Sequence, residues 1–256
     1  LLPNGRRIFN VAIRTIQLHK GQAIYGVGGG ITWDSTWESE YREVHQKAAV
    51  LYRKQARFQL ITTGKISQKR LLFEDQHLER LTKASRYFAY PFDPEELRQK
   101  IEEECQACDS HQDYRLRISL SKSGEIELSR QILTPLSPSF CQAKLCLQKA
   151  DLQQAFTYFK TTHRPHLSLG KQEIIYHNAA GELLETSIGN LVLKIDGKLY
   201  TPPINLGILS GIYRQHLLGK GQVEEKILTL ADLNQAEAVY GCNAVRGLYE
   251  LLLKEK

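Results

Sequence analysis

Two short stretches of sequence are the most informative in this chain: Tyr158-Phe159-Lys160-Thr161-Thr162-His163-Arg164 and Gly181-Glu182-Leu183-Leu184-Glu185-Thr186. The first offers a lysine, Lys160, among polar neighbours, and the second has a glutamate, Glu185, at the end of a polar turn. A lysine amine can bond covalently to a carbonyl compound and then carry protons, and a carboxylate can keep a neighbouring nitrogen protonated. Alone, the pair is weak evidence, since most lysines and glutamates are solvated surface charges.

Three further segments lie in a fixed order around this pair. They are His77-Leu78-Glu79-Arg80-Leu81-Thr82-Lys83-Ala84-Ser85 upstream, and Gly207-Ile208-Leu209-Ser210-Gly211-Ile212-Tyr213-Arg214 and Gly241-Cys242-Asn243-Ala244-Val245 downstream. Together the five segments resemble those of the fold-type IV pyridoxal phosphate enzymes, the class IV aminotransferase-like family. The resemblance covers Phe58 to the C-terminus, and the Cys-Asn-Ala form is similar to that of the family's 4-amino-4-deoxychorismate lyases.

The resemblance implies a role for each matching residue. Lys160 would form the Schiff base with pyridoxal 5′-phosphate, and Glu185 would lie beside the pyridine nitrogen. The residues that would hold the cofactor phosphate are Arg80 and the backbone amides of Gly211, Ile212 and Tyr213, with Asn243 on the phosphate or substrate side. A helix is expected to follow Ser210-Gly211, and a helix N-terminus offers free amides and the positive end of the dipole to an anion.

Other residues of these segments keep more than one interpretation. Thr63 resembles the threonine that assists proton transfer in the lyase, although an ordinary strand threonine would look the same. Arg164 would either meet a substrate carboxylate or support its own loop. His163 is interpreted as a structural hydrogen bonder, and Glu182 as a solvated carboxylate that competes with Glu185. The plain alternatives for Lys160 and Arg80 are an exposed strand lysine and a surface arginine on an amphipathic helix.

The resemblance implies a lyase that converts 4-amino-4-deoxychorismate to 4-aminobenzoate and pyruvate in folate biosynthesis. A class IV aminotransferase acting on branched-chain or D-amino acids would share Lys160, Glu185 and Arg80, so these residues do not discriminate. The Cys-Asn-Ala segment favours the lyase. A non-catalytic docking module is the alternative of another class, and the presence of both Lys160 and Glu185 argues against it.

Residues 1–54 resemble a different family. Residues 9–16 and 23–27 are predicted strands joined by residues 17–22, and a helix is expected through Lys47. This part resembles the C-terminal end of the chorismate-binding enzymes, specifically aminodeoxychorismate synthase component I. In that family the residues matching Arg14 and the Gly28–Gly30 amides receive substrate carboxylates, and a glutamate matching Glu43 binds magnesium with Glu40 nearby. Because the rest of that enzyme is missing here, we expect a remnant of the magnesium site and a fragment of a longer polypeptide.

Composition sets the remaining expectations. The chain has 256 residues with a net charge of +6, which suits an anionic substrate, and its basic residues are too dispersed to predict nucleic-acid binding. No apolar run approaches membrane-spanning length and no signal sequence is visible, so a cytoplasmic protein is expected. The expected partners are a second copy in a homodimer and the rest of the synthase with its glutamine amidotransferase. Cys105 and Cys108 are interpreted as two reduced thiols at a helix end.

Periodicity predicts an α/β (α+β) fold. The resemblance implies that the enzyme part has two subdomains, residues 55–140 and 141–256, with the cofactor in the crevice between them. The first half is predicted to hold a strand over residues 58–63, a helix over 78–89, a helix from the Asp93 cap to Cys105, and a hairpin of residues 114–120 and 126–133. The second half is predicted to hold strands over residues 144–148, 173–177, 187–195 and 199–200, and helices over 212–218 and 230–236.

Overall fold

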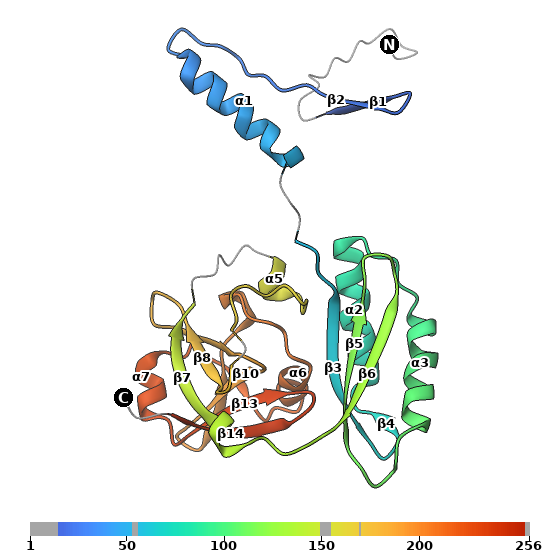
Figure 1. Cartoon of the computed structure of the whole chain (residues 1–256). Helices are drawn as coiled ribbons and strands as arrows, with labels where there is room; N and C mark the ends of the chain where they lie inside the picture. Colours follow the sequence, from blue (N-terminus) through green and yellow to red (C-terminus); the bar gives the residue numbers. More distant parts are fainter. Residues whose placement is uncertain (1–14, 53–55, 149–154, 169, 254–256) are drawn as a thin grey trace, which may run out of the picture. The chain divides into compact units, whose positions relative to one another are not determined.

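The computed structural model describes residues 15–52, 56–148, 155–168 and 170–253 of the chain. The chain divides into two compact units, residues 1–56 (unit 1) and residues 57–256 (unit 2). The elements of each unit can be followed in Figure 1. The boundaries predicted at residues 54 and 140 remain predictions.

The described part of unit 1 is a β-hairpin and one helix. Strands β1 (Ile16–His19) and β2 (Gln22–Tyr25) pair antiparallel, and helix α1 runs from Trp37 to Tyr52. The turn is Lys20-Gly21, with φ of 48° and 79°, which is the two-residue geometry that hairpins favour. The longer connection predicted over residues 17–22 is therefore wrong, and the strand predicted over residues 9–16 lies mostly outside the described residues.

Unit 1 exposes most of its apolar side chains. Residues 15–52 are all exposed or half-buried, and α1 buries none of its side chains. The exposed fractions of Trp33, Trp37 and Tyr52 are 101%, 72% and 81%. The described part of unit 1 therefore has no apolar core of its own.

The first sheet of unit 2 is antiparallel, with the strand order β4-β3-β5-β6. Its strands are β3 (Leu60–Ser67), β4 (Arg70–Leu71), β5 (Tyr114–Leu120) and β6 (Ile126–Ile132). One face is apolar and packs against helices α2 (Glu74–Phe88) and α3 (Pro94–Gln106) (Figure 1). The other face carries polar side chains, among them the register partners Thr63 and Arg117. This polar face is available to line a site.

Local sequence explains both helices of this half. Asp93 caps α3 and accepts a hydrogen bond from the Glu95 amide at 2.9 Å, with Pro94 in the first turn, as predicted. Helix α2 begins one turn earlier than predicted, because the chain enters it through Phe73 in the left-handed conformation (φ 58°) with no side-chain cap. The predicted hairpin is confirmed as β5 and β6.

The second sheet of unit 2 has eight strands in the order β12-β11-β10-β13-β14-β7-β8-β9. They are β7 (Gln142–Leu147), β8 (Ile174–His177), β9 (Leu183–Thr186), β10 (Asn190–Ile195), β11 (Lys198–Thr201), β12 (Glu224–Glu225), β13 (Ala238–Asn243) and β14 (Gly247–Leu253). Strand β9 also pairs with β10 through Glu185 and Asn190. The strands from β10 round to β9 therefore close into a ring, and Glu185 lies at the closure.

The remaining elements of unit 2 are short. They are α4 (Pro138–Cys141), α5 (Ala155–Tyr158), α6 (Ile212–Gly219), α7 (Leu230–Gln235) and the 3-10 turn η1 (Ile204–Leu206). The strand predicted over residues 187–195 begins only at Asn190, because the Thr186 amide bonds back to the Gly189 carbonyl in a tight turn at 2.9 Å. Strands β13 and β14 were not predicted. The two sheets confirm the predicted fold class of two α/β subdomains.

Cys105 and Cys108 are buried free thiols at the end of α3, as predicted. In the part of the chain that the structure describes, no helix combines the length and hydropathy that crossing a bilayer requires.

Candidate active site

A narrow cavity in unit 2 gathers nearly all of the residues that the sequence singled out. Its lining residues are Thr63, Arg80, Lys160, Arg164, Glu185, Ile188, Gly189, Asn190, Leu209, Gly211, Ile212, Cys242, Asn243 and Ala244. They come from β3, α2, the segment after α5, the closure of the second sheet, the start of α6 and the end of β13. Segments that are more than 100 residues apart in sequence thus meet at one place.

Lys160 is fixed by its own backbone, just after α5. Its carbonyl accepts a hydrogen bond from the Ile61 amide at 2.9 Å, and Thr161 forms an isolated bridge with Leu60 on β3. Burial, with the nearby charges of Arg164 and Arg80, lowers the pKa of Lys160 from 10.5 to about 7. A large fraction of this amine is therefore neutral and nucleophilic near neutral pH.

Glu185 is buried at the ring closure and lines the same cavity as Lys160. Its side chain is 3% exposed, and Arg164 Nη2 donates to its Oε1 at 2.9 Å. Burial raises the pKa of Glu185, whereas Arg164 and Lys160 act in the opposite direction. Arg164 therefore holds this carboxylate in place, and its own Nε is buried without a partner in the described residues.

Arg80 reaches from α2 to the loop before α6. Its Nη2 donates to the Ser210 carbonyl at 2.7 Å. Burial and the neighbouring Arg164 lower the pKa of Arg80 from 12.5 to about 10, so it remains a cation at neutral pH. The guanidinium thus lies beside the first residues of α6.

Helix α6 opens toward the cavity with Gly211 as its N-cap. Gly211 has no side chain to bond the first amides of the helix, so these donors remain available to an anion. A β-carbon on residue 211 would overlap the side-chain amide of Asn190, whose Nδ2 donates to the Leu209 carbonyl at 2.8 Å. Close packing against Asn190 therefore requires glycine at this position.

Asn243 and Tyr213 take different positions. Asn243 lines the cavity, and its Oδ1 accepts hydrogen bonds from the amides of Val245 (3.0 Å) and Arg246 (2.9 Å). The ring of Tyr213 packs edge-on against Phe73 at 6.1 Å between centroids, and Tyr213 does not line the cavity. Only its backbone amide, in the first turn of α6, remains a candidate for phosphate binding.

Two of the alternatives named from the sequence lie outside the cavity. Glu182 accepts a hydrogen bond from Asn178 Nδ2 at 2.6 Å within its own turn. The His163 ring packs edge-on against Phe156, 4.9 Å between centroids. Both side chains therefore have structural partners away from Lys160.

Sequence reasoning missed three polar residues around the site. Arg117 is the register partner of Thr63, and its charge contributes to the lowered pKa of Lys160. His77 is buried against Thr62, with 2.6 Å between Nδ1 and the hydroxyl, and burial lowers its pKa to about 3. The alternation of β5 was the signal for Arg117, since it put Arg115 and Arg117 on the face opposite the core.

The third missed residue is Glu173, a fully buried carboxylate behind the ring closure. Its Oε1 accepts hydrogen bonds from Ser187 Oγ (2.6 Å) and from the Ile188 amide (3.2 Å), and Oε2 accepts one from Tyr249 Oη (3.0 Å). These bonds fix the turn that follows Glu185 and joins β9 to β10. Glu173 therefore supports the wall of the cavity without lining it.

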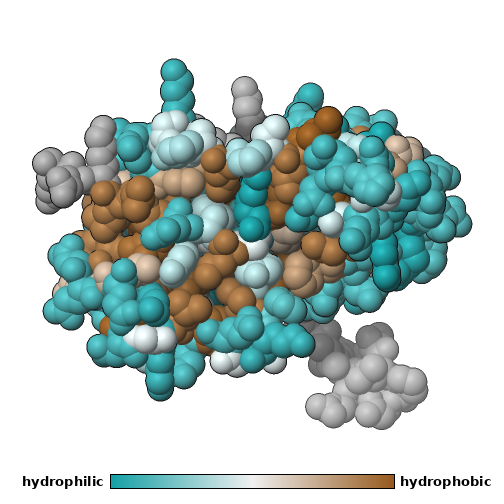
Figure 2. Space-filling model, turned by 90° about the horizontal axis from the view of Figure 1, so that it is seen from below, coloured by the Kyte–Doolittle hydropathy of each residue, from teal (hydrophilic) through white to brown (hydrophobic). Residues whose placement is uncertain are grey.

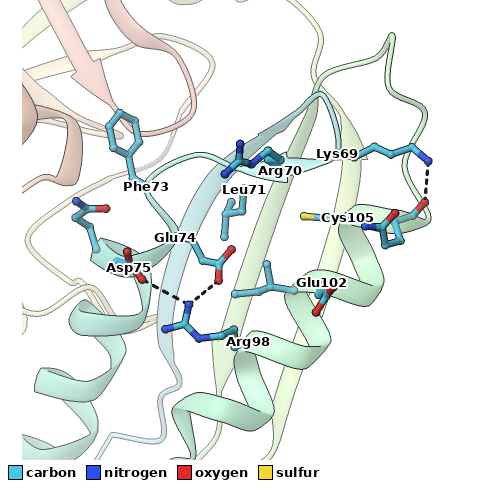
Figure 3. A pocket seen from close by; sticks show the side chains of 12 residues that line it. Lys69, Arg70, Leu71, Phe73, Glu74, Asp75, Arg98, Glu102 and Cys105 are labelled. Carbon is cyan, nitrogen blue, oxygen red and sulfur yellow. Dashed lines mark hydrogen bonds and ion pairs between the residues drawn. The ribbon is translucent and has the colours of Figure 1, made fainter.

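A second, wider hollow of unit 2 lies elsewhere, between the β3–β4 turn and helices α2 and α3 (Figure 3). It encloses about 520 Å³ and carries both signs of charge, with Arg98 bonded to Glu74 (3.1 Å) and Asp75 (3.5 Å). Cys105 lies at its edge, and burial raises the pKa of this thiol to about 11. Paired charges and an unreactive thiol do not make a catalytic set.

In unit 1, both glutamates of the expected magnesium remnant have other partners. Ser35 Oγ donates to Glu40 Oε1 at 2.7 Å, and Lys47 Nζ lies 2.5 Å from Glu43 Oε1. Among the described residues, no group of three or more His, Cys, Asp or Glu could hold a metal ion. Arg14 lies outside the described residues.

Comparisons with known proteins place this site in a family. Residues 59–251 match the family model for amino-transferase class IV, and residues 1–53 match that for chorismate binding enzyme. The aminodeoxychorismate lyase of Saccharomyces cerevisiae is 31% identical over 128 residues, which are 40% of this chain and 34% of the yeast protein. The chain thus spans about a third of that relative.

Solved structures agree with the family match. A provisionally named amino-acid aminotransferase from Mesorhizobium loti has a TM-score of 0.68 at 29% identity, over 77% of this chain and all (100%) of that one. The pyridoxal phosphate-bound form of a hypothetical aminotransferase from Mycobacterium tuberculosis shares the fold, with a TM-score of 0.62 at 19% identity over 77% and 81% of the chains. Since the family model covers most of unit 2, this chain belongs to the class IV aminotransferase family.

Proposed function

We propose that this chain is a pyridoxal phosphate-dependent lyase that converts 4-amino-4-deoxychorismate to 4-aminobenzoate and pyruvate. The observation that carries the proposal is the convergence of Lys160, Glu185 and Arg80 on one cavity. The yeast lyase similarity and the chorismate-binding match of residues 1–53 support the choice of substrate within the family.

The residues around the cavity fit pyridoxal phosphate. Arg80 and the free amides at the start of α6 offer a cation and hydrogen-bond donors to a phosphate. Gly189 and Gly211 both lack the β-carbon that would crowd this wall, since one at Gly189 would lie 2.6 Å from the Cys242 carbonyl oxygen. The Arg80 cation, the free amides of α6 and the two glycines are thus available to a phosphate. Lys160 and Glu185 line the same cavity.

Within this proposal, the amine of Lys160 would hold the cofactor covalently and, when free, would accept the proton from C4 of the substrate ring. Its lowered pKa gives it a neutral amine for both tasks at neutral pH. Glu185, held by Arg164, would be the carboxylate that keeps the pyridine nitrogen of the cofactor protonated. When bound, pyridoxal phosphate supplies the electron sink for the carbon that loses its proton.

Thr63 and Arg117 are neighbours on the polar face of the first sheet, and Thr63 lines the cavity. The Thr63 hydroxyl is therefore in a position to return a proton as the enolpyruvyl group leaves as pyruvate. Arg117 is its register partner and a cation, which suits a substrate carboxylate. Arg164 is already bonded to Glu185, so we assign it to that carboxylate rather than to the substrate.

An aminotransferase is the second candidate function. The similarity to the amino-acid aminotransferase from Mesorhizobium loti favours it, and the same lysine and glutamate would serve it. The two candidates differ in products, because an aminotransferase converts an amino acid and a keto acid into another pair and releases no aromatic acid.

The test supplies the cofactor-loaded chain with 4-amino-4-deoxychorismate and measures 4-aminobenzoate and pyruvate. Equal amounts of both products, lost in Lys160→Ala, are the expected result. Borohydride reduction followed by peptide mapping reports separately whether pyridoxal phosphate is attached to Lys160. An attached cofactor without either product would overturn the lyase and leave the aminotransferase, to be tried with branched-chain and D-amino acids.

We also propose a homodimer and an association with the remaining part of a chorismate-binding synthase. Apolar surface gathers on the left of the face shown in Figure 2, the side of the eight-stranded sheet. Strands β7 and β14 of that sheet carry leucines that are more than a third exposed: Leu145, Leu147, Leu252 and Leu253. Apolar surface of this kind favours a protein partner. The exposed aromatic residues of unit 1 favour the synthase association in the same way.

A further inference from the structure

We propose that Arg115 and Arg246 form an outer carboxylate subsite, which binds the second carboxylate of a dicarboxylate substrate. Arg117 would take the first carboxylate, nearer to Lys160. The proposal rests on the proposed function for the identity of that substrate, but it concerns a binding site that can be measured without turnover.

Strand geometry puts Arg115 in line with Arg117. The two residues are separated by one position on β5, so both side chains leave the same face of the sheet. Their register partners on β3 are Lys65 and Thr63, and Thr63 lines the cavity. Moving from Arg117 to Arg115 is a step of about 6.6 Å away from Lys160 along the strand. Such a spacing suits two carboxylates carried by one six-membered ring.

Arg246 reaches the same place from the second sheet. Its guanidinium Nη1 donates to the carbonyl of Thr134, just beyond the end of β6. Gln131, three residues earlier, is the register partner of Arg115 and accepts a hydrogen bond from Arg115 Nη1 at 3.4 Å. The amide of Arg246 is held by Asn243 Oδ1 at 2.9 Å, and Asn243 lines the cavity. Arg246 thus links the cavity wall to the outer end of β5 and β6.

The three arginines have no acidic partner within the described residues. Each is half-buried, and none forms an ion pair with a carboxylate there. The nearby Lys65 differs, because Asp113 neutralises it at 2.6 Å. Half-buried guanidinium groups without a counter-ion leave a positive potential that a bound anion would neutralise.

The charges of Arg115, Arg117 and Arg246 act on one another. Burial and Arg117 lower the pKa of Arg115, and burial and Arg115 lower the pKa of Arg246. Arg117 in turn contributes to the lowered pKa of Lys160. The repulsion therefore runs without interruption from the reactive lysine to the outer subsite, and a dianionic ligand would relieve it along its whole length.

Benzoate and isophthalate test the subsite, because they differ by one carboxylate and neither can react with the cofactor. We would measure the affinity of the cofactor-loaded full-length protein for each by calorimetry. The expected result is that isophthalate binds about tenfold more tightly than benzoate. In Arg115→Gln and in Arg246→Gln this preference is lost, while the affinity for benzoate stays within about twofold.

Arg86→Gln is the matched control, since Arg86 is exposed on α2 and has no place in the site. It should keep the full preference for isophthalate. Equal affinities of the unaltered protein for the two acids, or a preference that persists in both variants, would overturn the subsite. Arg246→Gln also loses the hydrogen bond to the Thr134 carbonyl. If that variant does not fold, the result with Arg115→Gln alone tests the subsite.

The binding test of the subsite can succeed or fail independently of the proposed lyase reaction. A protein that makes no 4-aminobenzoate but shows an Arg115-dependent preference for isophthalate would retain the subsite and lose the lyase. The opposite result, turnover with no such preference, would retain the lyase and remove the subsite. Added salt should reduce the preference for isophthalate in the unaltered protein. Salt screens the attraction between half-buried arginines and a carboxylate, although less than it screens exposed charges.

Discussion

Gly211 packs directly against the side-chain amide of Asn190, so that no β-carbon fits between the start of α6 and the closure of the second sheet. Asn190 cannot withdraw easily, because it is buried and bonded to the Leu209 carbonyl at 2.8 Å. The cavity wall on this side thus depends on one missing methyl group.

Gly211→Ala is therefore expected to weaken cofactor binding. The new methyl group must displace Asn190 or tilt the first turn of α6, which moves the free amides that would meet the phosphate. Overpacking of this kind costs about 1–3 kcal/mol, so we expect roughly tenfold or greater loss of affinity for pyridoxal phosphate. Equilibrium titration of the cofactor-free protein measures it.

Gly219→Ala serves as the comparison in the same helix. Nothing lies within 4 Å of the position that its β-carbon would occupy. Its affinity should match that of the unaltered protein, and a loss equal to that of Gly211→Ala would contradict the steric argument.

The second prediction concerns the pH at which Lys160 becomes reactive. Cofactor-free protein should capture pyridoxal phosphate faster as the pH rises through about 7, where the buried amine loses its proton. Arg164→Gln removes a cation beside Lys160 and should move this midpoint upward. Stopped-flow absorbance against pH measures both, and a midpoint near the ordinary lysine value of 10.5 in the unaltered protein would refute the assignment.

The same pKa has a consequence for stability. Since unfolding restores the pKa of Lys160 to 10.5, the unfolded chain holds more protons than the folded one between pH 7 and 10.5. The free energy of unfolding of the cofactor-free protein should therefore rise with pH across that window. Lys160→Met should be more stable than the unaltered protein near pH 7 and should lack this rise, as followed by denaturant titration.

Glu185→Gln tests the carboxylate at the ring closure. An amide cannot keep a pyridine nitrogen protonated, so we expect turnover to fall by about 100-fold or more while the cofactor still attaches to Lys160. The amide oxygen can still accept the hydrogen bond from Arg164. Loss of cofactor attachment together with turnover would instead assign Glu185 to binding.

Glu173→Gln tests the support behind the cavity. One of the two carboxylate oxygens becomes an NH₂ group, so an acceptor of Ser187, Ile188 or Tyr249 is lost in a fully buried place. We expect a loss of about 1–3 kcal/mol in the free energy of unfolding, with a smaller loss in Tyr249→Phe, which removes only one donor. Thermal and denaturant unfolding check the order of the two variants.

Helix capping and strand alternation predicted the elements whose form depends on residues close together in the sequence. The Asp93-Pro94 start of α3 and the β5–β6 hairpin follow from cap and alternation and are confirmed. Strands β13 and β14 were missed because part of their sequence, Gly241 to Val245, was interpreted only as a segment on the phosphate or substrate side of the site. Glycine usually weakens a strand, but here Gly241 makes room for the ring of Tyr249 on β14.

The residues of the site likewise divide into those that the sequence predicted and those that it could not. The resemblance named Lys160, Glu185 and Arg80 as residues for one site, and they line one cavity. No spacing in the sequence could show that Arg164 bonds to Glu185, or that Glu173 fixes the turn beside it, because both contacts depend on how the ring of strands closes. Arg117 and Arg115 were visible as an alternation but had no recognisable motif.

The exposed tryptophans of unit 1 make the two units spectroscopically separable. Trp33 and Trp37 are the chain's two tryptophans, and both belong to unit 1. Emission excited selectively at indole therefore samples the environment of unit 1, whereas the colour of a bound cofactor would sample unit 2. A heating experiment that records both signals would reveal whether the units melt together or in succession, and an indole signal alone would be blind to loss of the catalytic fold.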